Sequence, residues 1–133
     1  MQHAMNLGRR LVALVALALL AVGAVQAASL TLDKVSYASL PGDNVQIRLD
    51  FSGEAPQPGT FTIDNPARIA LDLPGIALGE VRKKQAIGVG VAQSIQAVEA
   101  GGRTRVVINL VRLVPYQVQT EERAIIVTLG QTT

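Results

Sequence analysis

The stretch that decides the fold is Asn65-Pro66-Ala67-Arg68-Ile69-Ala70-Leu71-Asp72-Leu73-Pro74-Gly75. It begins with the turn signal Asn65-Pro66 and ends with the turn signal Pro74-Gly75. Between them the side chains alternate, with Ile69, Leu71 and Leu73 on one side and Arg68, Ala70 and Asp72 on the other. Successive side chains of a strand point to opposite faces of its sheet, so the stretch predicts a half-buried β-strand with an open polar face.

Two opposite charges lie on that open face. Arg68 and Asp72 are four residues apart, which is roughly 13 Å at about 3.3 Å per strand residue. That separation is too long for a direct ion pair. Each side chain therefore needs a partner on a neighbouring strand, a water molecule or a ligand.

The same alternation recurs along the chain, and no amphipathic helix follows residue 28. Turn signals about every 8–12 residues are typical of short antiparallel strands. Gly101-Gly102 suits a two-residue hairpin between residues 94–100 and 104–111, because adjacent glycines supply positive φ angles. Residues 76–93 are expected to be mostly loop, with one short strand near 87–91. We predict an all-β fold, a two-sheet antiparallel β-sandwich of about seven or eight short strands. Its interior should contain Val45, Ile47, Leu49, Ile69, Leu71, Val106, Ile108 and Leu110.

Residues 1–27 have the pattern of a secretory signal peptide. Arg9-Arg10 precedes an apolar run over residues 11–22, and Val25-Gln26-Ala27 offers small residues for cleavage before Ala28. The alternative is a retained membrane anchor. The apolar run is shorter than the ~20 residues of a spanning helix, and no stop-transfer charge follows it, so cleavage is preferred. The expected product is one exported domain, residues 28–133, without membrane insertion after cleavage.

Composition excludes several functions of the exported part. The chain has twelve Lys+Arg and ten Asp+Glu, and removal of Arg9 and Arg10 leaves ten of each, so nothing favours nucleic-acid binding. There is no cysteine, and His3 lies in the leader, which removes thiol nucleophiles, His-dependent triads and most zinc sites. Glu121-Glu122 cannot flank one glycosidic bond, because adjacent strand residues face opposite ways. We expect no enzyme and no cofactor.

Several motifs together resemble a known family. Residues 65–75 are similar to the signature strand of the AMIN domain, residues 94–100 and 103–110 to its second half, and Tyr116 with residues 124–129 to its end. The leader, Leu40-Pro41-Gly42-Asp43 and Gly88-Val89-Gly90 are most similar to the first AMIN domain of type IV pilus secretins. The resemblance covers almost all of residues 28–133. The order and spacing of the motifs make it specific.

The resemblance implies a periplasmic two-sheet module that binds peptidoglycan. In pilus secretins such a module helps to seat an outer-membrane complex in the cell wall, so the implied partners are peptidoglycan and proteins of a pilus or secretin complex. Gln93 departs from the family, which often has a basic residue there, and weaker glycan binding is the expected effect. The alternative is a protein-interaction module that docks pilus assembly proteins without sugar contact.

The candidate binding residues are polar positions on the predicted strands, namely Arg68, Asp72, Arg105, Asn109 and Arg48. Arginine can hold a stem-peptide carboxylate through two hydrogen bonds. The competing interpretation is that these charges pair across strands on a solvated face, where ion pairs contribute little. The basic run Arg82-Lys83-Lys84 is either a contact to anionic wall polymer or a solvated loop.

The extent of the natural product is a further expectation. Gln131-Thr132-Thr133 has the polar character of an interdomain linker. We expect the chain to be the front end of a longer secretin-like protein. The alternative is a stand-alone periplasmic protein.

Overall fold

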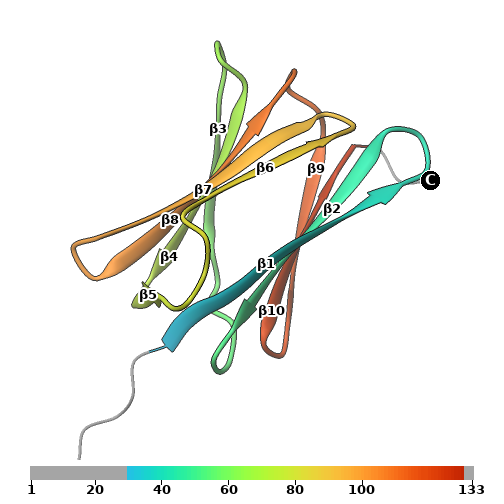
Figure 1. Ribbon diagram of the computed structural model, residues 1–133. Coiled ribbons are helices and arrows are strands. Elements are labelled where there is room, and N and C mark those ends of the chain that lie inside the picture. The colour runs from blue at the N-terminus through green and yellow to red at the C-terminus, as the bar shows by residue number, and fades with distance from the viewer. Residues whose placement is uncertain (1–29, 131–133) are drawn as a thin grey trace, which may run out of the picture.

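Two five-stranded β-sheets pack face to face in the computed structural model of the protein, which describes residues 30–130 (Figure 1). The described residues contain ten strands and no helix. The expected leader, residues 1–27, and the polar tail, residues 131–133, lie outside the described residues. The prediction of an all-β, two-sheet sandwich is confirmed, with ten strands where about seven or eight were expected.

The first sheet, sheet A, contains both ends of the described chain. Its strand order is β5-β1-β2-β10-β9. The pairs are antiparallel except β1 with β5, which is parallel. The bounds are β5 (Ile76–Leu78), β1 (Leu30–Leu40), β2 (Asn44–Phe51), β10 (Ala124–Leu129) and β9 (Tyr116–Glu121).

The second sheet, sheet B, is antiparallel throughout, in the order β3-β4-β8-β7-β6. The stretch of residues 65–75 contains its strand β4, which lies between β3 and β8. The bounds are β3 (Gly59–Ile63), β4 (Arg68–Pro74), β8 (Arg103–Leu110), β7 (Ala92–Ala100) and β6 (Lys84–Val89).

The apolar side chains of both sheets meet between the layers. Ile69, Leu71 and Leu73 of β4 are fully buried, as the alternation predicts. The eight residues predicted for the interior are all buried, and they belong to one continuous core. A register shift between Leu32 and Lys34 interrupts the β1–β2 pair. The alternation in the sequence therefore predicts correctly which side chains of the main strands face the core.

Residues 76–93, expected to be mostly loop with one short strand near 87–91, contain two strands, and the second overlaps the expected one. β5 follows Gly75, whose φ of 72° turns the chain out of sheet B, and it pairs with Leu30–Leu32 at the start of β1. β6 pairs with β7 across the turn that contains Gly90. β5 has only three residues and β6 contains Gly88, so neither short sequence indicates its partner strand.

A buried hydrogen bond joins the two sheets where β5 crosses over. Thr104 of β8 is fully buried, and its hydroxyl donates to the carbonyl oxygen of Ile76 at 2.7 Å. A buried polar group without a partner is costly, so this bond favours the observed position of β5 against sheet B.

Residues 30–130 include no helix with the length and apolar character needed to cross a membrane.

Replacing Leu71 with Ala should lower the free energy of unfolding by roughly 2 to 5 kcal/mol, because the fully buried side chain leaves a cavity in the core. Urea denaturation of the exported domain measures the change. The matched control is Leu113→Ala in the loop after β8, where the side chain is 40% exposed and the loss should stay within about 0.5 kcal/mol. Equal losses in the two variants would contradict the assignment of Leu71 to the core.

Candidate ligand-binding face

Four of the five predicted site residues lie on one surface, the outer face of sheet B. In the register between β4 and β8, Arg68 is opposite Asn109 and Asp72 is opposite Arg105. Ile69 and Leu71 of β4, and Val106 and Ile108 of β8, alternate with these residues and belong to the core, so the four polar side chains point away from it. The fold therefore brings Arg68, Asp72, Arg105 and Asn109 together, in two cross-strand pairs.

Asp72 and Arg105 form a two-contact ion pair. Arg105 Nε donates to Asp72 Oδ1 at 2.7 Å and Nη2 donates to Oδ2 at 3.1 Å. The hydrogen bond from Arg105 lowers the pKa of Asp72 below its usual value, and the same bond raises the pKa of Arg105. The Arg105 guanidinium carbon also lies 5.2 Å from the centre of the Phe61 ring, within cation–π range. Arg105 is therefore already engaged by protein groups.

The second pair differs, because its arginine has no such partner. Asn109 donates from its side-chain nitrogen to Ser94 Oγ at 2.9 Å, which fixes the amide on the face. Arg68 is half-buried, and within residues 30–130 it makes no ion pair. Its Nε atom is buried and lacks a hydrogen-bond partner among those residues. Among the four clustered residues, Arg68 is thus the cation that is left for a ligand.

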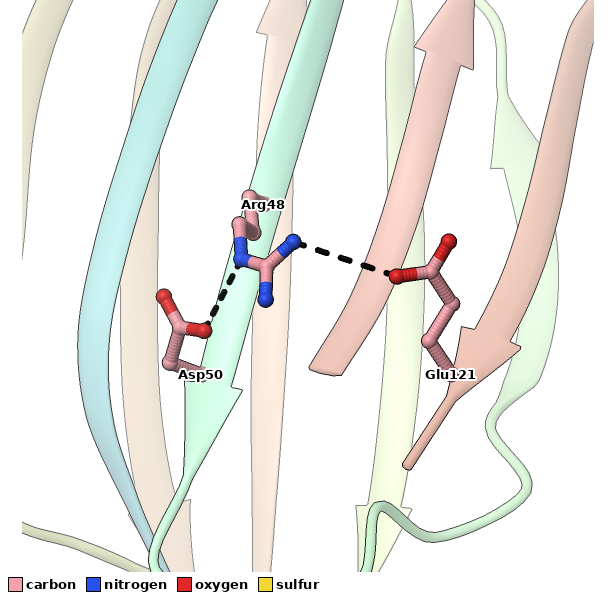
Figure 2. Close-up of polar contacts among 3 residues, drawn as sticks. All are labelled: Arg48, Asp50 and Glu121. Carbon is pink, nitrogen blue, oxygen red and sulfur yellow. Dashed lines mark hydrogen bonds and ion pairs between the residues drawn. The ribbon is translucent and has the colours of Figure 1, made fainter. Parts of the chain in front are cut away.

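The fifth predicted residue, Arg48, is elsewhere. Its neighbours Ile47 and Leu49 are buried between the sheets, so Arg48 of β2 lies on the outer face of sheet A, on the opposite side of the sandwich. Figure 2 shows its guanidinium between Asp50 and Glu121, with Nε 2.9 Å from Asp50 Oδ1 and Nη1 3.9 Å from Glu121 Oε2. The structure does not join Arg48 to the other four residues.

A groove at the edge of sheet B was not found by sequence reasoning. It has a volume of about 500 Å³ and is lined by Leu78, Gly79, Lys83, Lys84 and residues 96–99. Gln96 is opposite both Lys84 and Val107, whereas Leu78 belongs to β5 of sheet A, so the groove lies where the β6 and β7 end of sheet B meets β5. Among the described residues neither lysine forms an ion pair, whereas the Glu99 carboxylate accepts the Leu78 N–H at 2.8 Å. The basic run in the sequence was the available signal, but its pairing in β6 was not visible.

The described part of the chain offers no site for a metal ion. No three His, Cys, Asp or Glu side chains gather there in a suitable arrangement. The outer face of sheet B presents arginine and amide groups, which can form hydrogen bonds and charge pairs.

The Asp72–Arg105 pair predicts a pH dependence of stability. Because the pKa of Asp72 is lowered on folding from 3.8, the pair stabilises the fold above that pH and this contribution disappears as the pH falls through the lower, folded-state value. Urea denaturation of the wild type and Asp72→Asn should show a constant difference in unfolding free energy above about pH 5, which shrinks at lower pH.

The control for this prediction is the same comparison in an Arg105→Gln background. In that background, the effect of Asp72→Asn on the free energy of unfolding should become small and nearly independent of pH. The main cause of the lowered pKa of Asp72 is then absent. A pH profile of Asp72→Asn that parallels the wild type down to about pH 2 would contradict the role of the pair.

Comparison with known proteins assigns the family. Residues 34–129 match the AMIN domain family, which is most of the described sandwich. The chain is also 41% identical over 99 residues to the fimbrial assembly protein PilQ of Pseudomonas aeruginosa. The aligned part is 74% of this chain but only 14% of that relative, so the chain spans a small part of the length of PilQ. No solved structure matches the chain significantly. On the family match and this identity, the chain belongs to the AMIN domain family.

Proposed function

We propose that residues 28–133, released from the leader of residues 1–27, form a non-catalytic peptidoglycan-binding module in the periplasm. The unpaired Arg68 on the outer face of sheet B is the observation on which this proposal depends. The relative named as a fimbrial assembly protein supports a role in pilus assembly. In that role the module attaches an outer-membrane pilus or secretin complex to the cell wall.

The chemistry of the face suits the stem peptides of peptidoglycan, which have carboxylates and amides. The terminal nitrogens of Arg68 can donate two parallel hydrogen bonds to a carboxylate, and such charge-assisted bonds are roughly twice as strong as neutral ones. The side-chain oxygen of Asn109 is beside it to accept an N–H, because the amide nitrogen is held by Ser94. Since Arg68 is half-buried, salt screens its interaction less than that of an exposed cation.

The remaining polar residues of the face have supporting roles in this proposal. The Asp72–Arg105 pair and the ring of Phe61 form a fixed surface farther along β4, roughly 13 Å from Arg68 at the ion pair, and are not the primary anion contact. The groove with Lys83 and Lys84 offers a second place for anionic groups, about three strand spacings, or roughly 14 Å, across the sheet from β4. A ligand with repeated carboxylates can reach both places.

Co-sedimentation of the exported domain with purified peptidoglycan sacculi tests the proposal. Arg68→Gln should weaken binding roughly 10- to 100-fold, the equivalent of about 1.5–3 kcal/mol for a hydrogen bond to a charged group. Arg68→Lys should bind more tightly than Arg68→Gln but less tightly than the wild type. Lysine keeps the positive charge but cannot donate two parallel hydrogen bonds as a guanidinium does. Circular dichroism should show an unchanged β-sheet spectrum for both variants.

The matched control is Arg48→Gln, the same substitution on the outer face of sheet A, which should leave sedimentation unchanged. An equal loss from Arg48→Gln and Arg68→Gln would show only a non-specific charge effect and would contradict the assigned face. If the wild-type domain stays in the supernatant at low salt but still co-purifies with a pilus assembly protein, the module acts by protein docking instead.

A further inference from the structure

The sheet edge formed by β3 is exposed and carries no charged residue. The edges are formed by β3 and β6 in sheet B, and by β9 and the β5–β1 side in sheet A. Four of the five residues of β3 are exposed and the fifth, Ile63, is half-buried. In Figure 1, β3 is the green strand at the upper margin of its sheet, paired with β4 alone.

The inner side of β3 is also uncovered. Thr60 is opposite Leu71 and Thr62 is opposite Ile69, and both of these β4 residues are fully buried against sheet A. The two threonines point to the same side of the sheet as those core residues, yet both are exposed. The sandwich interior therefore ends at β4, and β3 extends beyond it with an unpaired backbone edge.

The other edges have features that oppose pairing with another strand. β1 contains Lys34 next to a register shift, and its first residues are covered by β5. β6 contains Lys84 and a register shift between Ala86 and Val89. β9 ends in the charged Glu121. Charges and bulges are the usual protection of an exposed edge, and β3 has neither a charge, a proline nor a bulge.

The sequence of β3, Gly-Thr-Phe-Thr-Ile, is complementary to itself in the antiparallel direction. When two copies are centred on Phe61, the phenylalanines are opposite each other, Thr60 is opposite Thr62, and Gly59 is opposite Ile63. Aromatic pairs and threonine pairs are favourable across strands, and no like charges meet. Threonine, phenylalanine and isoleucine also have high strand propensity.

We propose that β3 is a self-association edge, through which two copies of this chain pair antiparallel about a two-fold axis at Phe61. Sheet B of one copy then continues into sheet B of the other as a single ten-stranded sheet. The contact is isologous, since each copy uses the same strand. A pairing of five-residue strands buries less than the ~1,000 Å² of a stable interface, so the dimer is weak and reversible.

The pairing places the two outer faces of sheet B on one surface. From strand spacing and residue rise, the two Arg68 residues lie roughly 20 Å apart in the pair. This consequence for ligand binding rests on the proposed function, whereas the pairing itself does not. It gives a polymer with repeated anionic groups two equivalent contacts.

Sedimentation velocity of the exported domain without ligand, up to about 1 mM, tests the pairing. The mean mass of the wild type should rise with protein concentration. Amide hydrogen exchange in residues 59–63 should slow as the fraction of dimer increases. The double variant Thr60→Lys, Thr62→Lys should stay monomeric over the same range, because it places like charges opposite each other. The double variant Thr60→Glu, Thr62→Glu should also be monomeric.

An equimolar mixture of the lysine and glutamate variants is the decisive measurement. Opposite charges then face each other at both positions, so the mixture should associate as well as the wild type or better. The matched control, Gln117→Lys with Gln119→Lys on β9, should dimerise like the wild type. A wild type that is monomeric at about 1 mM, a mixture that fails to associate, or a β9 variant that alone abolishes association would each overturn the proposal. Because no peptidoglycan is present, these results are independent of the sacculi experiment.

Discussion

Burial of one side of β4 against sheet A is the interaction on which the rest of the structure depends. Three side chains of this strand, Ile69, Leu71 and Leu73, are fully buried. A slip of one residue would move them to solvent and turn Arg68 and Asp72 into the core, where an unpaired charge is far more costly than an exposed leucine. Burial of these three side chains thus fixes the register of β4 with β3 and β8. That register decides which polar groups meet on the outer face.

The two arginines on this face show how similar strand positions can have different roles. Both Arg68 on β4 and Arg105 on β8 point outward from central strands of sheet B. Arg105 has a carboxylate opposite it, forms an ion pair and lies over an aromatic ring. Arg68 has an amide opposite it, and that amide is itself held by Ser94. The interpretation of these charges as ordinary cross-strand pairs therefore holds for Asp72 with Arg105, while a ligand contact is best supported at Arg68.

Local alternation was sufficient to predict the fold class, the core residues of β2, β4 and β8, and the outward direction of the candidate residues. It could not predict β5, because this three-residue strand exists through pairing with β1, which lies far away in the sequence. It also could not tell which sheet a strand joins, and so Arg48 was grouped with residues on the opposite side of the sandwich. The register between strands likewise decides which arginine lies opposite a carboxylate. The sequence of a single strand does not contain that information.

The positions of β1 and β10 on either side of β2 have a mechanical consequence. Both pair antiparallel with β2, so they run parallel to each other, with Leu32 near Phe51 at one end of β2 and Leu129 near Val45 at the other. Figure 1 shows the two ends of the described chain at opposite ends of the sandwich. Tension between them pulls β1 and β10 lengthwise in opposite directions past β2. The hydrogen bonds of an antiparallel ladder are perpendicular to its strands, so such a load shears the whole ladder at once instead of unzipping it bond by bond.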